Sequence, residues 1–438
     1  MFQIILAILF VIGYLLISME ARTHINKGAI SLLMSVTLWT SLIFFRHVEP
    51  SGHMSAEEAR VEFVIDQLME HMGDVAGILF FLICAMTIVE VVDHYHGFRI
   101  VTDAIKTGKF FSFLWITSGI TFFLSSVLDN LTTTIVMVSL VKNLVANRPQ
   151  RWLVVSMIVV AANAGGAWSP IGDVTTTMLW IGGQVTPSNI ILKLFIPSLL
   201  CLLLPLMVLT LGRAPHLKLF RHKVISRAQE SGLTRRDQNI VFITGCLSLI
   251  FVPVFKSLTH LPPYLGIIMS MGILWVVTEI LHKSRPGVAE RYSFENGLRR
   301  IDLPSVFFFL GILLSIGALE AAGSLDLAAH FLEEHLGNKY FLAGIAGLIS
   351  AIVDNVPMVA AFQHMFEYPV DDLFWEGLAY CAGTGGSLLI IGSAAGVAAM
   401  GMEPITFGWY LKNISPLALA GYLAGLLSYF AVNQIISP

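Results

Sequence analysis

Charged residues are scarce in this chain. Only 13% of the 438 residues are Asp, Glu, Lys or Arg and 56% are apolar, whereas a soluble globular protein carries about 25% charged residues. So few charges cannot cover the surface of a soluble protein of this length. The net charge of -3 also provides no basic face for nucleic acid. The composition therefore disfavours a soluble enzyme, a nucleic-acid-binding protein and a disordered scaffold. It predicts a helical protein that crosses a membrane several times.

Cysteine pairs and catalytic motifs are also missing. The four cysteines lie singly in apolar segments, with no CxxC spacing, which predicts buried thiols rather than disulfides or a metal cluster. No Walker motif, GxGxxG, HExxH or GxSxG occurs, so neither NTP hydrolysis nor hydrolase chemistry is supported. We therefore expect a protein that is not an enzyme and that has no cofactor. The cysteines are Cys84, Cys201, Cys246 and Cys381.

Segments long enough to cross a bilayer recur along the chain. A spanning helix needs about 20 apolar residues, and this length allows roughly ten such helices with modest loops. The first run has no preceding Lys or Arg and no small-residue cleavage site, so we expect a retained helix. Eight runs are continuous, two contain glycine, two have a polar centre, and two amphipathic stretches are typical of interfacial helices. The continuous runs are 2–19, 28–45, 74–92, 190–211, 238–256, 263–282, 304–320 and 408–435, and the runs with glycine are 152–183 and 374–401. The runs with a polar centre are 110–145 and 339–366, and the amphipathic stretches are 55–72 and 324–336.

The distribution of Lys and Arg among the loops predicts the orientation. The loops 212–237 and 283–303 are rich in both residues, so we expect them on the cytoplasmic side. The loops 93–109 and 19–27 fall on the same side, and the less basic loop 46–73 falls on the other. This assignment is consistent only if the two segments with a polar centre are re-entrant hairpins. Both chain termini are then periplasmic.

Two motifs recur in the same order in the two halves. Ser-x3-Asp-Asn begins at Ser125 in the first hairpin segment and at Ser350 in the second. Gly-Gly-x5-Gly begins at Gly165 and at Gly385, within the two glycine-interrupted segments. Each half then contains five spans and one re-entrant hairpin. Because five is an odd number, the second half must enter the membrane from the opposite side, as the loop charges also indicate.

These features predict the fold class and the domain organisation. We expect an all-α polytopic membrane protein built from an inverted repeat of five spans plus one re-entrant hairpin each, with discontinuous helices. Such a repeat is typical of secondary transporters, whose site lies at the repeat interface. Residues 1–211 should form the first repeat, 212–237 a cytoplasmic basic linker and 238–438 the second repeat.

The hairpin tips provide the first candidate site residues. An ionised carboxylate at mid-membrane costs about 2.5–3.5 kcal/mol on insertion scales, which favours cation and proton binding by Asp129 and Asp354. Each carboxylate could instead cap its hairpin by accepting hydrogen bonds from backbone N–H groups, and the two roles are compatible. Each nearby serine could likewise bond to a helical carbonyl. The side chains that can reach the same space are Asn130, Asn355, Ser125, Ser350 and Thr132.

The interrupted segment 152–183 provides the second set of candidates. Its Asp173 and Asn163 offer oxygen ligands, and its Gly and Pro residues interrupt the helix, which frees backbone carbonyls for a cation. Asp173 could also be the N-terminal partner of the second half-helix. Ser393 takes the place of Asp173 in the second repeat, so the two half-sites are chemically unequal. The other candidates are Thr175 and Thr176, with Gly165, Gly166, Gly172, Gly385, Gly386 and Gly392 at the expected helix breaks.

Two glutamates end matched helices. Glu90 lies near the end of 74–92, and Glu320 ends 304–320. They are candidates for a proton path or for pH sensing. The alternative is that they are interfacial polar residues without a part in transport.

The candidate side chains suit a hard monovalent cation. Na⁺ and Li⁺ prefer oxygen ligands, and carboxylate, amide, hydroxyl and carbonyl oxygens are all present. Burial disfavours the charged form of a carboxylic acid, so an acid in the site can exchange a proton for a metal ion near physiological or alkaline pH. Competition between the two ions for Asp129 would produce antiport without a separate coupling device. The metal ion is then only the transported substrate.

The motifs resemble those of the NhaD-type sodium/proton antiporters of the ion transporter superfamily, over almost the whole chain. The resemblance implies exchange of cytoplasmic Na⁺ or Li⁺ for external protons across a bacterial inner membrane, in pH homeostasis. It also implies a homodimer with a scaffold and a transport domain, and elevator-like motion. Its functional positions are Asp129, Asn130, Asn163, Asp173, Thr175, Thr176, Ser350 and Asn355. The motifs are Leu128–Thr134 (LDNLTTT), Asn163–Thr177 (NAGGAWSPIGDVTTT), Ser350–Pro357 (SAIVDNVP) and Thr384–Ser393 (TGGSLLIIGS).

Three other functions stay open. Dicarboxylate/Na⁺ symporters of the superfamily resemble this architecture, but they carry Ser-Asn-Thr at tips where this chain has Asp129-Asn130 and Asp354-Asn355. A fixed acid at each tip disfavours an anion, although helix ends would favour one. An intramembrane aspartyl protease could use the two tip acids as its dyad, but the expected Gly-x-Gly-Asp motif is missing. A channel is less favoured, because paired broken helices are typical of alternating access.

Overall fold

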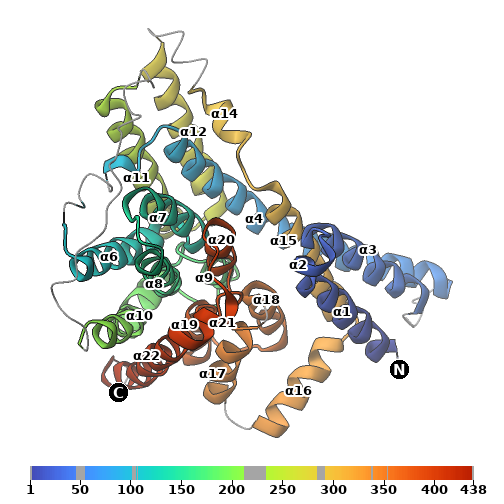
Figure 1. Ribbon diagram of the computed structural model, residues 1–438. Helices are drawn as coiled ribbons and strands as arrows, with labels where there is room; N and C mark the ends of the chain where they lie inside the picture. The colour runs from blue at the N-terminus through green and yellow to red at the C-terminus, as the bar shows by residue number, and fades with distance from the viewer. Residues whose placement is uncertain are drawn as a thin grey trace. The chain divides into compact units, whose positions relative to one another are not determined.

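A computed structural model describes most of the chain, and its regular elements there are helices (Figure 1). The arrangement confirms an all-α polytopic membrane protein, since several of these helices are long and apolar. The described residues are 2–45, 55–100, 105, 107–211, 233–283, 292–336, 339–352 and 354–436.

Several loops of the topology prediction lie outside the described residues. Of the basic linker expected at 212–237, only 233–237 is described. Residues 46–54 and 284–291 are also outside. The orientation in the membrane and the side on which the termini lie therefore stay predictions.

The helices of the two halves follow one another in a similar order. In the first half they are α1 (Phe2–Ser18), α2 (Glu20–Thr23), α3 (Lys27–Phe45), α4 (Ala56–His94), α6 (Phe110–Leu128), α7 (Asn130–Leu144), α8 (Arg148–Ala167), α9 (Val174–Ile181) and α10 (Pro187–Thr210). In the second half they are α11 (Arg235–Thr259), α12 (Pro263–His282), α14 (Phe294–Leu298), α15 (Leu303–Ala321), α16 (Ser324–Leu336), α17 (Lys339–Ser350), α18 (Asn355–Met365), α19 (Leu373–Gly385), α20 (Ala394–Met402), α21 (Phe407–Asn413) and α22 (Ser415–Ile436).

Length and composition identify the candidate membrane spans. Within the described ranges, eight helices are long and apolar enough to cross a membrane: α3, α4, α6, α10, α11, α12, α15 and α22. Shorter apolar helices lie at Phe2–Ile17, Asn130–Lys142 and Phe341–Ser350. The last two belong to the predicted hairpins 110–145 and 339–366, and the first arm of the first hairpin, α6, is itself long enough to span.

Two of the expected segment boundaries were wrong. The amphipathic stretch 55–72 is not a separate interfacial helix, because α4 runs without a break for 39 residues. No proline lies in that sequence, so its amphipathic start continues into the apolar run. The expected span 408–435 is instead divided into α21 and α22, on either side of Ile414. Pro416 in the first turn of α22 cannot donate the backbone hydrogen bond that would extend α21.

The predicted interruptions occur where the repeated motifs lie. Asp129 alone separates α6 from α7, and the discontinuous helices break between α8 and α9 and between α19 and α20. One detail of the expectation was wrong, since three glycines lie in the last helical turn before the break rather than in it. They are Gly165 and Gly166 of α8 and Gly385 of α19.

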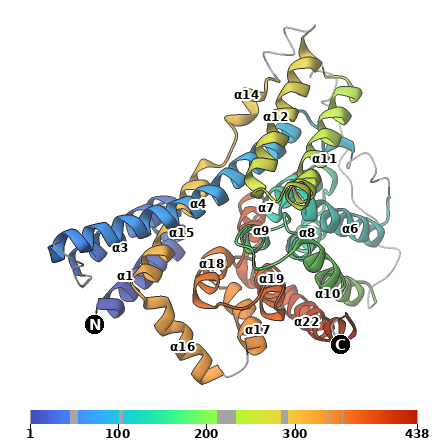
Figure 2. The same cartoon turned by 180° about the vertical axis from the view of Figure 1, so that it is seen from behind.

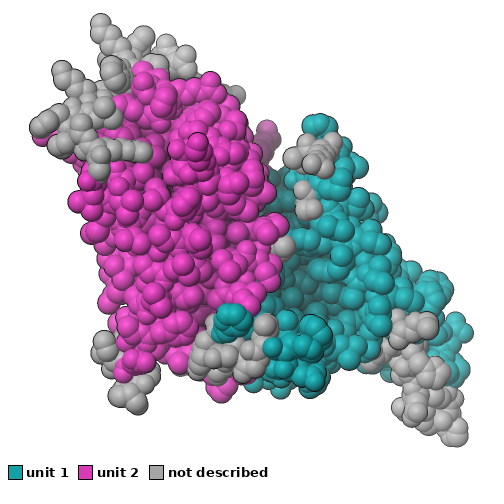
Figure 3. Space-filling model, turned by 60° about the horizontal axis from the view of Figure 1, so that its bottom comes forward, with its two compact units in different colours: residues 1–83, 302–342, 356–367 teal, residues 84–301, 343–355, 368–438 magenta. Residues whose placement is uncertain are grey.

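The chain forms two compact units, coloured separately in Figure 3. Unit 1 comprises residues 1–83, 302–342 and 356–367, and unit 2 comprises 84–301, 343–355 and 368–438. Each unit draws helices from both halves of the sequence. The boundaries of the repeats therefore differ from those of the compact units, and the division at 1–211, 212–237 and 238–438 stays a prediction about the repeat.

In unit 1, α3 packs against both α15 and α1 (Figure 2). A Cβ atom at Gly311 of α15 would lie 2.4 Å from the Ser31 carbonyl carbon of α3. The absence of a side chain there allows the two backbones to approach. The Trp39 indole N–H also donates to the Leu314 carbonyl oxygen over 2.9 Å, which joins the same two helices.

In unit 2, the first arm of each hairpin packs closely against a discontinuous helix. A Cβ atom at Gly165 would lie 2.2 Å from the Phe122 carbonyl oxygen, and one at Gly385 would lie 2.1 Å from the Gly347 carbonyl oxygen. Phe122 and Gly347 each precede the motif serine by three residues. The same backbone contact therefore recurs at the same register in both halves, and it accounts for the double-glycine motif.

The close contact at Gly165 leads to a test of stability. Gly165→Ala should lower the thermal unfolding midpoint in detergent, because overpacking a tight contact costs about 1–3 kcal/mol. The matched control is Gly119→Ala in α6, where a Cβ atom would meet nothing within 4 Å. The control should leave the midpoint unchanged or raise it, since alanine favours a helix by about 0.5–1 kcal/mol over glycine. Equal midpoints for the two variants would contradict the packing argument.

Candidate functional site

Asp129 forms the tip of the first hairpin. It ends α6 and caps α7, and its Oδ1 accepts from the Thr132 backbone N–H over 2.7 Å. Its Oδ2 accepts from the Thr132 hydroxyl over 2.9 Å. These bonds confirm the capping interpretation. The φ angle of 91° is one that aspartate rarely adopts. Such backbone strain occurs mainly at functional sites, so capping and ion binding stay compatible.

Asn130 joins the hairpin to the first discontinuous helix. Its side-chain amide donates to the Asn163 Oδ1 over 3.1 Å and to the Asp173 Oδ2 over 2.8 Å. Asn130 is only 5% exposed. One side chain of α7 thus contacts residues on both sides of the helix break, in α8 and at the start of α9.

Asp173 caps the second part of this discontinuous helix. Its Oδ1 accepts from the backbone N–H and the hydroxyl of Thr175, each over 3.1 Å. The Thr176 hydroxyl donates to the Asp173 backbone carbonyl over 2.9 Å. The expected role as N-terminal partner of α9 is confirmed. Asp173 is 2% exposed, and the partners that the structure gives its carboxylate are all uncharged.

The second discontinuous helix reaches the same cluster. The Asn163 side-chain amide donates to the Ser393 hydroxyl oxygen over 3.0 Å, and Ser393 caps α20 by accepting from the Gly396 N–H over 3.2 Å. A Cβ atom at Gly383 of α19 would lie 3.6 Å from the Asp173 Oδ2. Both discontinuous helices therefore contribute to one polar cluster inside unit 2.

The hydroxyl groups of the two motif serines bond to backbone carbonyls of the discontinuous helices. The Ser125 hydroxyl donates to the Ala162 carbonyl over 2.6 Å, and the Ser350 hydroxyl donates to the Ala382 carbonyl over 2.9 Å. Each bond runs from a hairpin arm to a discontinuous helix. Of the two roles open to these serines, the structure places both hydroxyls on helical carbonyls.

The tip of the second hairpin lies at Asp354 and Asn355. Asp354 precedes α18, and its charge acts on Asp173. Asn355 is the first residue of α18 and is 5% exposed. The charge of Asp173 acts in turn on Asp129. Asp173 thus has another carboxyl group near it in each hairpin, and a cation or a proton would relieve the repulsion between ionised groups there.

Comparison with known proteins identifies the family. The citrate transporter family, CitMHS, matches residues 14–376. The chain is 46% identical to sodium/proton antiporter 1 of Arabidopsis thaliana, over 99% of this chain and 73% of the relative. It is 30% identical to the Na⁺/H⁺ antiporter NhaD of Alkalimonas amylolytica, over 97% of this chain and 89% of the relative. The chain belongs to the NhaD-type sodium/proton antiporter family. The predicted family is thereby confirmed.

A solved structure with the same fold is also known. The YdaH transporter of Alcanivorax borkumensis, whose crystal structure is described as having an unusual topology, matches with a TM-score of 0.58. The match covers 94% of this chain and 98% of that chain at 14% identity, and it concerns the fold alone. Like the named NhaD-type relatives, this protein is a transporter rather than an enzyme. NhaD-type antiporters use no cofactor, because the transported ions are their substrates.

Glu90 and Glu320 have partners outside the polar cluster. The Glu90 Oε2 lies 3.6 Å from the Arg300 Nε. Glu320 belongs to unit 1, where its Oε2 faces His71 Nε2 at 3.7 Å and pairs with His364 Nδ1 at 2.5 Å. No finding tests a proton path through either glutamate, and that role stays a prediction.

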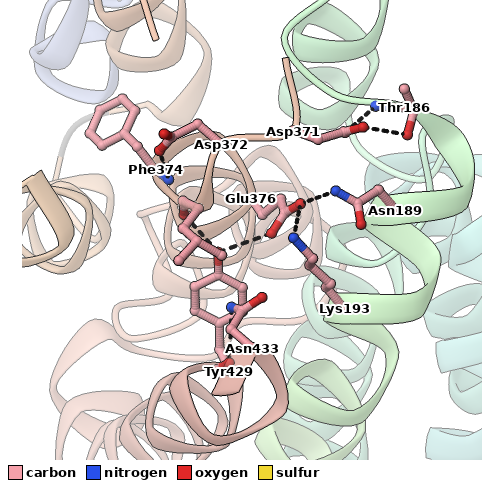
Figure 4. A network of polar contacts seen from close by, with 10 residues as sticks. Thr186, Asn189, Lys193, Asp371, Asp372, Phe374, Glu376, Tyr429 and Asn433 are labelled. Carbon is pink, nitrogen blue, oxygen red and sulfur yellow. Dashed lines mark hydrogen bonds and ion pairs between the residues drawn. The ribbon is translucent and has the colours of Figure 1, made fainter. Parts of the chain in front are cut away.

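Sequence reasoning missed the contacts of three buried polar residues of unit 2, one in the candidate site and two in a separate cluster. Ser393 was known to align with Asp173, but its bond to Asn163 was not expected. Lys193 and Glu376 form a buried ion pair in unit 2 (Figure 4). The signal for this pair was present in the sequence, since both residues are charged and lie within apolar segments.

The position of Ser393 leads to a test of the cluster. Ser393→Ala should lower the thermal unfolding midpoint, because it removes a helix cap worth about 1 kcal/mol and leaves the Asn163 amide without this acceptor. Ser428→Ala is the control, since that hydroxyl bonds to the Gly425 carbonyl of its own helix. The bridging role is wrong if both variants lower the midpoint equally.

Proposed function

We propose that this protein is a secondary active transporter that exchanges cytoplasmic Na⁺ or Li⁺ for external protons. The observation that supports it most is the Asp173 carboxylate, which is 2% exposed and bonded to Asn130 and Thr175. Within the described part of the chain, the structure gives Asp173 no basic partner. A buried carboxylate without a positive partner must be neutralised by a proton or by a bound cation.

Other buried acids of unit 2 provide the contrast. The Glu376 Oε1 lies 3.0 Å from the Lys193 Nζ, and the Glu403 Oε1 lies 2.7 Å from the Arg151 Nε. Each of these acids has a basic side chain beside it, so neither needs a metal ion to balance its charge. Asp173 differs in having only neutral donors, which is the condition for alternate binding of a proton and a metal ion.

The proposed mechanism is competition for one set of oxygens. Asp173 and Asp129 supply carboxylates, and the Asn130 amide oxygen, which neither of its two donor bonds uses, is a further ligand. A Na⁺ ion that binds these groups displaces the proton, and a proton that returns displaces the Na⁺. Because both ions need the same carboxylate oxygens, uptake of one requires release of the other.

The repeated order of helices and the division into two compact units support alternating access. We assign unit 2, which contains the polar cluster, as the transport domain, and unit 1 as the scaffold of an elevator-like mechanism. The proposal also includes the properties that the family resemblance implies. These are an inverted repeat, a homodimer, a bacterial inner-membrane location and periplasmic termini.

Anion symport is the second candidate, because the matching family carries the name citrate transporter. Helix N-termini at the cluster would attract an anion. The carboxylates of Asp129 and Asp173 at two of these N-termini oppose it, since they would repel a citrate or dicarboxylate ion.

The primary test is transport by purified protein in proteoliposomes with an imposed pH gradient, between about pH 7 and pH 10. Na⁺ or Li⁺ should collapse the gradient, and K⁺, succinate and citrate should not. The expected response saturates with Na⁺ concentration, which separates a carrier from a channel. Uptake of labelled citrate or succinate without any response to Na⁺ alone would replace this proposal with anion symport.

The role of Asp173 has a matched control in the same unit. Asp173→Asn should abolish Na⁺-driven proton movement, because the amide still caps α9 but cannot exchange a proton for a cation. Asp372 caps α19 by accepting from the Phe374 N–H over 2.8 Å, and Asp372→Asn should retain transport. Thermal unfolding of both variants would show that each is folded. Retained transport in folded Asp173→Asn protein would contradict the role of this carboxylate.

A further inference from the structure

A second polar cluster lies inside unit 2, on α10, α19 and α22 (Figure 4). The Lys193 Nζ lies 3.0 Å from the Glu376 Oε1, and the two side chains are 7% and 0% exposed. The Asn189 side-chain amide donates to the same carboxylate oxygen. The Tyr429 hydroxyl lies 3.1 Å from the other oxygen, Oε2. All the polar atoms of the Glu376 carboxyl group therefore have protein partners.

The cluster is separate from the Asp173 site but lies on the same helix. Glu376 precedes Gly383 by seven residues on α19, which corresponds to about 10 Å along the helix axis. Gly383 is the position whose Cβ atom would lie 3.6 Å from the Asp173 Oδ2. α19 therefore carries Glu376 near one end and contacts Asp173 near the other. Of these two buried acids, the structure gives a basic partner only to Glu376 within the described residues.

Stability alone does not account for this ion pair. The cost of removing two charges from water can exceed their attraction, and well-packed apolar residues are often at least as stable. Lys193 lies in an apolar segment, where ionisable residues are rare and generally functional, and Glu376 lies in the first turn of α19. The pair therefore calls for a role in which its charge matters.

The Tyr429 hydroxyl shows where a proton fits. Its oxygen lies 2.6 Å from the Leu373 carbonyl oxygen and 3.1 Å from the Glu376 Oε2. A phenol has one hydrogen, and a carbonyl can only accept, so the shorter contact uses that hydrogen. The remaining contact to Oε2 is then satisfied when the Glu376 carboxyl group carries the proton and donates it to the Tyr429 oxygen. When the carboxylate is ionised, the single phenol hydrogen can serve only one of the two acceptors, so one of the two contacts lacks a hydrogen.

We propose that Glu376 is a second proton-binding site, with the proton on Oε2 between the carboxyl group and Tyr429. Lys193 and Asn189 bond to Oε1 whether the carboxyl group is ionised or protonated. Uptake of the proton changes the charge of the cluster from zero to +1, with no cation ligand involved. The groups that act on Glu376 are Lys193 and Tyr429, and the more distant Asp371, whose carboxylate bonds to Thr186.

The binding of this proton can be tested without transport. Infrared difference spectra of purified protein in Na⁺-free buffer, titrated between about pH 5 and pH 10, should show a protonated-carboxyl C=O band that Glu376→Gln removes. Glu403→Gln is the control, because Glu403 is similarly buried and also pairs with a basic side chain, Arg151, but its Oε2 has no hydrogen-bond partner among the described residues. It should leave the band in place. Identical difference spectra for wild type and Glu376→Gln would overturn the proposal.

Tyr429→Phe tests the assignment to Oε2 and serves if Glu376→Gln does not fold. Loss of the acceptor should disfavour the protonated form, so the C=O band should titrate about one pH unit lower than in wild type. A shift to higher pH would show that the phenol donates to an ionised carboxylate, and it would overturn the assignment.

A part for this proton in transport rests on the proposed antiport function. The proton count per Na⁺ can be measured in proteoliposomes from the membrane potential at which net exchange stops. Glu376→Gln should transport fewer protons per Na⁺ than wild type. An unchanged ratio would limit Glu376 to a proton site outside the transport cycle and overturn this step. If wild-type protein shows no Na⁺/H⁺ exchange, the antiport function itself fails, whatever the infrared result.

Discussion

The two hydrogen bonds of the Asn130 amide hold the candidate site together. They connect the first hairpin to Asn163 before the helix break and to Asp173 after it. The bond from Asn163 to Ser393 then extends the connection to the second discontinuous helix. Together with the packing of the helices, these bonds fix how the ends of four helix segments lie relative to one another. The chemistry proposed for Asp173 depends on this frame, because it places uncharged donors around a buried carboxylate.

Capping and ion binding use the same side chains. Asp129 and Asp173 each accept a backbone N–H at the start of a helix, as helix caps ordinarily do. A carboxylate that caps a helix end is fixed in position by the backbone, and it keeps lone pairs free for a cation. The backbone thus positions the acids of the motif, and in the proposed mechanism their charge stays available for ion exchange.

The sequence predicted features that local chemistry determines. Ser-x3-Asp-Asn and the double glycines located the hairpin tip at Asp129 and the breaks after α8 and α19 within a few residues, because helix caps act locally and the motifs recur in both halves. Contacts between distant segments were not predictable. The bond between Asn163 and Ser393 and the pair of Lys193 with Glu376 depend on which helices pack together. Hydropathy also could not show that α4 continues without a break.

Three helices begin at the candidate site: α7 at Asn130, α9 after Asp173 and α20 after Ser393. The N-terminus of a helix carries roughly half a positive charge. These helix ends therefore weaken the attraction between the acids and a bound cation. A transporter must release its ion within each cycle, and a site of carboxylates alone would retain it for longer. In the proposed mechanism, these helix ends would therefore favour release of the cation and rapid turnover over tight binding.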